Sequence, residues 1–279
     1  MNTCKTLEKQ GFSVTYLNVD KNGFISLEEL ENFIRVDTIL ISIMYANNEI
    51  GTIQLIENIA RIAKLNNVYF HTDAVQAIGN VRINVKELGI DLLSMSAHKF
   101  YGPKGVGALY VKEGIDFERI QDGGHQEKGK RSGTENLAGI VGLAEAIKLS
   151  YNEFEYNNKK VLELRNYFIS KLKQLDNNIK INGDLEKRLA GNINISFPNQ
   201  DGQQLLLGLD EYGICASAGS ACSTGSSKPS HVLTSIGLSK EESMGTLRFT
   251  LGKENTRQEI DYTVKIFRKM LNTYKNINT

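Results

Sequence analysis

Cysteine, proline and tryptophan are scarce in this sequence. Its 279 residues include three cysteines, three prolines and no tryptophan. An odd and sparse cysteine count does not fit a disulfide framework, and the absence of a C-x-x-C pair makes a structural zinc site unexpected. The chemistry of the protein must therefore be sought in other residue types, or in a single reactive thiol.

Charge of one sign and long apolar runs are missing as well. Lysine plus arginine number 33 and aspartate plus glutamate 32, and the basic residues form no stripe of the kind that binds nucleic acid. No apolar run approaches the roughly 20 residues of a membrane span. The N-terminus, MNTCKTLEKQG, has no signal-peptide core. We expect a cytoplasmic protein that binds neither nucleic acid nor membrane.

The first half of the sequence alternates strand and helix patterns. Such alternation favours an α/β fold with a mostly parallel sheet that helices cover on both faces. Helices are predicted at 2–11, 26–34 and 53–67, and strands at 12–19, 38–46, 68–76, 91–100 and 106–111.

The second half begins with a long helical stretch, 135–175, which we expect to be bent or interrupted. After it the patterns predict a strand, a helix, a strand with a loop, a short helix, a strand and a terminal helix, at 192–198, 202–213, 215–230, 231–237, 246–252 and 256–276. We therefore expect a large domain, 1–152, and a smaller C-terminal α/β domain, 153–279.

Residues 18–29, NVDKNGFISLEE, have the oxygen spacing of an EF-hand calcium loop. An EF-hand also needs a helix that runs into the loop, and the preceding residues alternate like a strand. A turn with Gly23 at positive φ explains the same residues, if Ser26 then caps a helix and Glu29 completes its capping box. We expect the turn and no calcium site.

The segment 91–111, DLLSMSAHKFYGPKGVGALYV, carries the strongest local signal for chemistry. A strand delivers Ser96, His98 and Lys99 to its carboxyl end, where ligands bind in open α/β sheets. A lysine that is desolvated there has a lowered pKa and can form a Schiff base with a carbonyl. Taken alone, Lys99 also fits an ordinary surface lysine.

A carboxylate at the end of a neighbouring strand changes that interpretation. Asp73 ends the strand in HTDAVQAIG, and Gln76 follows three residues later. A lysine and an aspartate at adjacent strand ends suit pyridoxal phosphate, because the aspartate keeps the pyridine nitrogen protonated and the ring becomes an electron sink. Asp73 also fits the N-cap of a helix, and the two roles are compatible.

The segment 216–233, ASAGSACSTGSSKPSHVL, places Cys222 among small residues. Few bulky neighbours would shield its thiol, which can act as a nucleophile if the thiolate is accessible. Taken alone, Cys222 also fits an incidental cysteine. Cys215 ends an apolar stretch and is predicted to be buried, and Cys4 is predicted to be structural.

Together these segments resemble the cysteine desulfurases of the NifS/IscS type, which are class V aminotransferases among the fold-type I pyridoxal-phosphate enzymes. The matching stretches occur in the family's order and span nearly the whole chain. The Ser/Gly-rich loop after Cys222 resembles that of the long-loop members that feed iron–sulfur cluster assembly. The matching segments are 42–54, 71–79, 94–111, 130–136, 217–233 and 246–252.

The resemblance implies roles for the cofactor residues. Lys99 would form the Schiff base with the cofactor aldehyde. Asp73 would pair with the pyridine nitrogen, and Gln76 would face the phenolic oxygen of the ring. Ser96 and His98 would bind the phosphate.

The resemblance also implies which residues bind or attack the substrate and which residue reaches the partner subunit. Asn48 would lie near the cofactor and the substrate carboxylate, and Arg248 would clamp that carboxylate with its guanidinium. Thr134 would reach the phosphate of the neighbouring subunit, because the family is dimeric. Cys222 would attack the sulfur of the substrate.

The implied reaction converts L-cysteine to L-alanine, with a persulfide formed on Cys222 and passed to an iron–sulfur scaffold or another sulfur acceptor. Two alternatives remain open. One is another class V enzyme, such as a selenocysteine lyase or an aminotransferase, which needs no thiol at Cys222. The other is a non-catalytic remnant that dimerises or binds a partner.

Two departures from the family pattern matter for these expectations. The stretch 1–11 resembles a region well inside the chains of family members, so we expect the family's phosphate loop and ring-stacking histidine to be lacking from this sequence. None of the four histidines, His71, His98, His125 and His231, sits at the stacking position. His125 stands where the family often has glycine.

Overall fold

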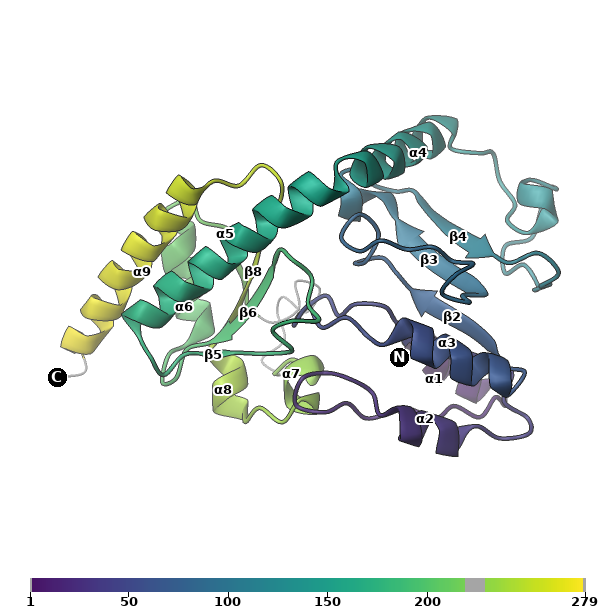
Figure 1. Ribbon diagram of the computed structural model, residues 1–279, viewed down its shortest axis with the longest axis horizontal. Coiled ribbons are helices and arrows are strands. Elements are labelled where there is room, and N and C mark those ends of the chain that lie inside the picture. Colours follow the sequence, from purple (N-terminus) through teal and green to yellow (C-terminus); the bar gives the residue numbers. More distant parts are fainter. Residues whose placement is uncertain (1, 219–228, 278–279) are drawn as a thin grey trace.

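The protein is organised around two sheets, each with its own hydrophobic core. The computed structural model describes residues 2–218 and 229–277. Figure 1 shows the lobe built from the N-terminal half on one side and the lobe built from the C-terminal half on the other, joined by two consecutive helices. These helices are α4 (Leu137–Asn152) and α5 (Phe154–Leu175).

The first sheet is four-stranded and mostly parallel. Its order is β1-β2-β3-β4, with β1, β2 and β3 parallel and β4 antiparallel to β3. The mostly parallel sheet predicted from the sequence is therefore confirmed. Its strands are β1 (Leu40–Met44), β2 (Tyr69–Asp73), β3 (Leu92–Ser96) and β4 (Gly107–Val111).

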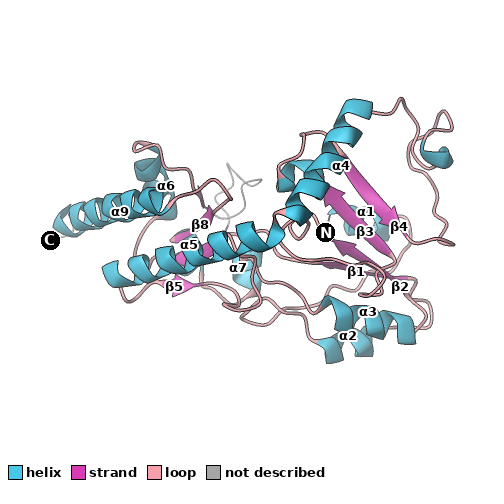
Figure 2. Cartoon of the chain, turned by 45° about the horizontal axis from the view of Figure 1, so that its top comes forward, coloured by secondary structure: helices cyan, strands magenta, loops and turns pink. Residues whose placement is uncertain are grey.

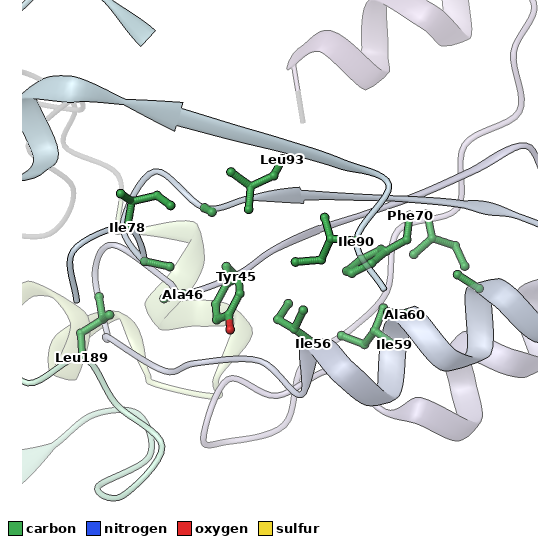
Figure 3. Packing of buried hydrophobic residues seen from close by; sticks show 14 of the residues in the cluster. Tyr45, Ala46, Ile56, Ile59, Ala60, Phe70, Ile78, Ile90, Leu93 and Leu189 are labelled. Atoms are coloured by element: carbon green, nitrogen blue, oxygen red, sulfur yellow. The ribbon is translucent and has the colours of Figure 1, made fainter. Parts of the chain in front are cut away.

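One face of this sheet holds the larger core. Helices α2 (Leu27–Phe33) and α3 (Ile56–Leu65) pack on the same side, as Figures 1 and 2 show. Ile56 and Ile59 of α3 point toward Phe70 of β2 and Ile90, in the same core as Leu93 of β3 (Figure 3). Because α4 adds residues to the same core, α3 and α4 together cover this face.

The opposite face of the first sheet is more open. Leu40, Tyr69 and Leu109 lie on it and are 48%, 50% and 46% exposed. The alternation of buried and less buried positions along β2, and along the first three residues of β1, follows from this one-sided cover. Asp73 and Ser96 belong to the same open face, because side chains two residues apart share a face.

The second sheet is antiparallel and smaller. Its order is β5-β6-β8-β7, with α5, α6 (Gly202–Asp210) and α9 (Arg257–Ile277) packed on it. The rings of Phe168, Phe249 and Phe267 form its aromatic centre. Its strands are β5 (Lys180–Ile181), β6 (Asn192–Ser196), β7 (Ser217–Ala218) and β8 (Thr246–Thr250), and the short helices α7 (His231–Ser235) and α8 (Lys240–Met244) lie between β7 and β8 in the chain.

Strand β6 joins the two lobes. Ile193 and Ile195 enter the core of the second sheet, while Asn192 and Asn194 point the other way. Both asparagine side chains donate to the backbone carbonyl of Glu49, at 3.0 and 3.2 Å. The loop that follows β1 is therefore fixed against the smaller lobe.

Several local predictions are confirmed. The first helix, α1 (Asn2–Lys9), ends before Gly11 as expected, and the helical stretch 135–175 is interrupted at Glu153. Residues 20–24 form the predicted turn, in which Asp20 Oδ1 accepts the N–H groups of Asn22 and Phe24.

The end of that turn behaves largely as predicted. Gly23 has φ +87°, a conformation that L side chains rarely adopt. Ser26 Oγ accepts the N–H of Glu29, so the predicted N-cap is confirmed, but the Glu29 carboxylate does not bond back to the N–H of Ser26 and the predicted capping box is not completed. No helix leads into the turn, since residues 12–19 are not helical.

Two predictions are wrong. Residues 12–19 form no strand beyond an isolated bridge from Val19 to Ile25, because their alternating side chains meet no neighbouring strand. Cys215 is exposed rather than buried, because the chain is already leaving α6 at this point to enter β7. The short elements β5 and α8 and the 3-10 helices η1 (Ala97–Phe100) and η2 (Glu127–Gly129) were not anticipated.

None of the described helices is long and apolar enough to cross a bilayer.

The aromatic centre of the smaller lobe should carry much of its stability. Phe267 is fully buried, stacked on Phe197 and edge-on to Phe249. Phe267→Ala should lower the free energy of unfolding by about 3–5 kcal/mol, because a ring-sized cavity cannot collapse. Phe12→Ala is the matched control, since Phe12 is 51% exposed. Urea denaturation of both variants checks this, and equal losses would contradict it.

Candidate active site

Three parallel strands end at the same edge of the first sheet. Met44 of β1 pairs with Asp73 of β2, and Asp73 pairs with Ser94 of β3. The chain segments that leave these strands therefore start side by side. They carry the predicted residues Asn48, after β1, and Lys99, after β3.

Asp73 is held at the last position of β2. Its carbonyl accepts the N–H of Tyr45, at 2.8 Å, and its Oδ1 accepts the N–H of Val75, at 3.0 Å. No α-helix follows, because residues 75–80 form turns around an isolated bridge from Ile78 to Val81. Asp73 thus caps a turn rather than a helix, and its second carboxylate oxygen accepts no hydrogen bond from the described residues.

Ser96 and His98 are neighbours at the end of β3. Ser96 Oγ and His98 Nδ1 share a hydrogen bond of 2.9 Å. Helix η1 carries His98 and Lys99 and ends at Phe100, and the C-cap residue Tyr101 has the left-handed φ of +67°. A Cβ on Gly107 would lie 2.6 Å from the carbonyl oxygen of Met95, so only glycine lets β4 return this closely beside β3.

A cavity of about 420 Å³ lies at the junction of the two lobes. Its size is within the range of small-molecule sites. Five of the predicted site residues line it, namely Asn48, Gln76, His98, Lys99 and Arg248.

The other predicted residues are not in that lining. Among the described residues, Asp73 and Ser96 stand at the neighbouring strand ends, and Thr134 is exposed in the segment that precedes α4. Cys222 lies outside the described residues.

The smaller lobe contributes Arg248 to the lining of the cavity. Its guanidinium donates to the backbone carbonyl of Asn48, at 3.0 Å, and to Ser217 Oγ, at 3.3 Å. Its Nε is buried and has no hydrogen-bond partner in the described part of the chain. A buried donor without a partner is costly, so this nitrogen is suited to an anionic ligand.

The sequence predictions missed several polar residues close to this site. His71 lies two residues before Asp73 and bonds to Ser42 and Ser94, and Ser217 bonds to Arg248. The alternation along β2 could have revealed His71, because it predicts that His71 and Asp73 face the same side. Only the pairing of β7 with β8 reveals Ser217.

Comparisons with known proteins agree with this geometry. The family model described as aminotransferase class-V matches residues 1–263. A curated cysteine desulfurase IscS from Clostridium botulinum (strain Hall) is 52% identical over 97% of this chain and 69% of its own length. Another from Methanosarcina thermophila is 50% identical over 100% of this chain and 69% of its own length.

Solved structures agree as well. A NifS-like protein matches 98% of this chain and 72% of its own, with 40% identity and a TM-score of 0.90. A structure of SspA in complex with cysteine matches 91% of this chain and 71% of its own, with 37% identity and a TM-score of 0.76.

The chain belongs to the class V aminotransferases, pyridoxal-phosphate enzymes of fold-type I. Within this family, its similarity over nearly the whole chain places it among the cysteine desulfurases. The residues present fit the cofactor. A primary amine lines the cavity, a carboxylate ends the adjacent strand, and a hydroxyl and an imidazole that can bind phosphate come from the same segment as the amine.

The guanidinium of Arg248, which bonds to both Asn48 and Ser217, should stabilise the junction of the lobes. Arg248→Lys keeps the charge but cannot reach Asn48 and Ser217 together, since an ammonium lacks the planar fork. We expect a loss of about 1–3 kcal/mol in the free energy of unfolding, because polar groups are left buried and unpaired. Urea denaturation measures it, with Arg61→Lys on the exposed side of α3 as control. A similar change in both variants would contradict the expectation.

Proposed function

We propose that the cavity between the lobes is where the desulfurase removes sulfur from cysteine. The observation that carries this proposal is that Lys99 and Arg248, from opposite lobes, line one cavity. An amine that can bind the cofactor and a guanidinium that can bind the substrate are thus within reach of one small molecule. Neither lobe alone supplies both groups.

The cofactor would be held by groups from β2 and β3. Asp73 would face the pyridine nitrogen and Gln76 the phenolic oxygen, while Ser96 and His98 would bind the phosphate. Bound pyridoxal phosphate supplies an electron sink for the substrate carbon. Lys99 Nζ would bind the cofactor aldehyde, and the same amine would be placed to move the proton of the substrate Cα.

The substrate carboxylate would be bound by Arg248 beside Asn48. Arg248 is already oriented by the carbonyl of Asn48 and by Ser217. A guanidinium fixed in this way loses little conformational freedom when it binds a carboxylate. The cysteine side chain would then be turned away from Arg248, and its sulfur would be open to attack.

Cys222 would accept the sulfur. Its thiolate would attack Sγ of the substrate and form an S–S bond. The Cβ–Sγ bond of the substrate would break, and the electron pair of that bond would remain on Cβ. Protonation of that carbon leads to alanine, and the enzyme retains a persulfide. Exchange with a thiol of a sulfur-acceptor protein, such as an iron–sulfur scaffold, would pass the sulfur on.

The described residues on either side of Cys222 support this role. Ser217 bonds to Arg248, which bonds to the carbonyl of Asn48. Ser230 Oγ donates to the buried carboxylate of Glu49, at 2.6 Å. Ser217 and Ser230 are thus tied to two consecutive residues, of which Asn48 lines the cavity and Glu49 is buried next to it.

We also propose that the enzyme is a homodimer and that α4 lies in the subunit interface. Leu137 and Val141, one turn apart on α4, are 70% and 60% exposed. An apolar helix surface of this kind is typical of a protein interface. Thr134 lies three residues before α4 and could then reach the phosphate in the partner's site.

The first prediction for this function concerns Lys99. Lys99→Ala should abolish the visible absorption band of the bound cofactor and the release of alanine from cysteine, because no other group makes the covalent bond. Lys104→Ala, an exposed lysine on the following turn, should leave both unchanged. An enzyme that still forms alanine without Lys99 would refute its role, and a colourless wild-type protein after cofactor addition would favour a non-catalytic remnant.

The second concerns the thiol. Cys222→Ala should keep the cofactor band and abolish persulfide formation, measured by mass spectrometry after incubation with cysteine. Cys215→Ala is the matched control, because Cys215 is exposed and only seven positions away. Undiminished sulfur transfer by the Cys222 variant would contradict the proposal.

The third concerns the dimer. Val141→Asp places a charge in the proposed interface and should shift the protein from dimer to monomer at micromolar concentration, because an unpaired buried charge is costly. Sedimentation analysis measures the shift. Lys64→Asp, at an exposed position of α3 and away from α4, should leave the oligomeric state unchanged.

A further inference from the structure

A histidine bridges the three parallel strands beside the proposed cofactor site. His71 occupies the middle of β2, with Ser42 on one side and Ser94 on the other. His71 Nδ1 lies 2.8 Å from Ser42 Oγ, and His71 Nε2 lies 2.8 Å from Ser94 Oγ. Both ring nitrogens are therefore used, each by a hydroxyl on a different strand.

This environment favours the neutral imidazole. Burial lowers the pKa of His71, and the nearby charge of Asp73 opposes that shift with a smaller effect. A hydroxyl both donates and accepts, so a neutral ring can donate to one serine and accept from the other in either tautomer. A protonated ring would have two donors, and both serines would have to accept.

The bridge reaches Asp73 by two routes. Asp73 follows His71 by two residues and lies on the same face of β2. Ser94 is the register partner of Asp73, and its carbonyl accepts the N–H of Ala74, at 3.0 Å. A displacement of Ser94 would therefore shift the backbone at Asp73, which carries the carboxylate.

We propose that His71 is a positioning residue for the cofactor: its imidazole ties Ser42 and Ser94 together and so holds the carboxylate of Asp73 toward the pyridine nitrogen. The proposal rests on the proposed role of Asp73. The neutral state of His71 matters, because a cationic imidazole beside Asp73 would stabilise the carboxylate in place of the pyridinium. Nothing else in the mechanism uses this histidine.

The experiment uses the holoenzyme with pyridoxal phosphate labelled with ¹⁵N at the pyridine nitrogen. The ¹⁵N chemical shift reports whether that nitrogen is protonated, and a titration of apoenzyme gives the dissociation constant of the cofactor. The variants are His71→Asn, which cannot reach both serines, and Ser94→Ala, which keeps the ring but removes one partner. His231→Asn is the control, because His231 is exposed at the start of α7.

His71→Asn should weaken cofactor binding roughly tenfold and move the ¹⁵N shift toward the unprotonated value, since the loss of a fixed charge-assisted contact is worth about a factor of ten. Ser94→Ala should give a smaller change in the same direction, and His231→Asn none. Thermal unfolding of each variant identifies any that do not fold, and Ser94→Ala then carries the test.

If His71→Asn and Ser94→Ala change the melting temperature but leave the shift and the dissociation constant unaltered, the bridge is merely structural and the proposal is overturned. Asp73→Asn separates this result from a failure of the proposed function. If Asp73→Asn leaves the pyridine nitrogen protonated, the role of Asp73 is wrong, whatever His71 does.

Discussion

The parallel pairing of β1, β2 and β3 is the constraint on which the site depends. Parallel strands point their carboxyl ends to one edge, so residues far apart in the sequence leave the sheet together. Asp73 and Lys99 are 26 positions apart, yet Asp73 is the last residue of β2 and Lys99 comes three positions after the end of the adjacent β3. A one-residue slip in this register would turn Asp73 to the buried face, where a carboxylate has no partner.

The second requirement is a fixed junction between the lobes. The backbone of residues 48–49 accepts hydrogen bonds from three side chains of the smaller lobe, Asn192, Asn194 and Arg248. These bonds bring the guanidinium of Arg248 to a cavity whose amine comes from the other lobe. Chemistry that needs a cofactor anchor and a substrate clamp is thus divided between two cores that are packed separately.

Features that are encoded in local residue patterns could be predicted from the sequence, whereas features that depend on contacts between distant segments could not. The strands at 68–76 and 91–100 carry their signal in local patterns, and so the candidate residues at their ends could be named in advance. The segment 12–19 alternates just as well but finds no partner strand, and pairing is a long-range property that alternation does not encode. The exposure of Cys215 likewise depends on where α6 ends and β7 begins.

The polar contacts around the site were predictable only in part. The placement of His71 on the face of Asp73 follows from a period of two. Its two serine partners do not, because they come from the register of β1 and β3 against β2. The tie between Ser217 and Arg248 depends in the same way on the pairing of β7 with β8.

The central claim is that the amine at the end of β3 and the carboxylate at the end of β2 serve one cofactor. Borohydride reduction of the holoenzyme, followed by proteolysis and mass spectrometry, tests it most directly because reduction makes the lysine–cofactor bond permanent. The account predicts that the pyridoxyl group is found on the peptide that contains Lys99. Its recovery on a peptide with any other lysine, or on none, would contradict the account.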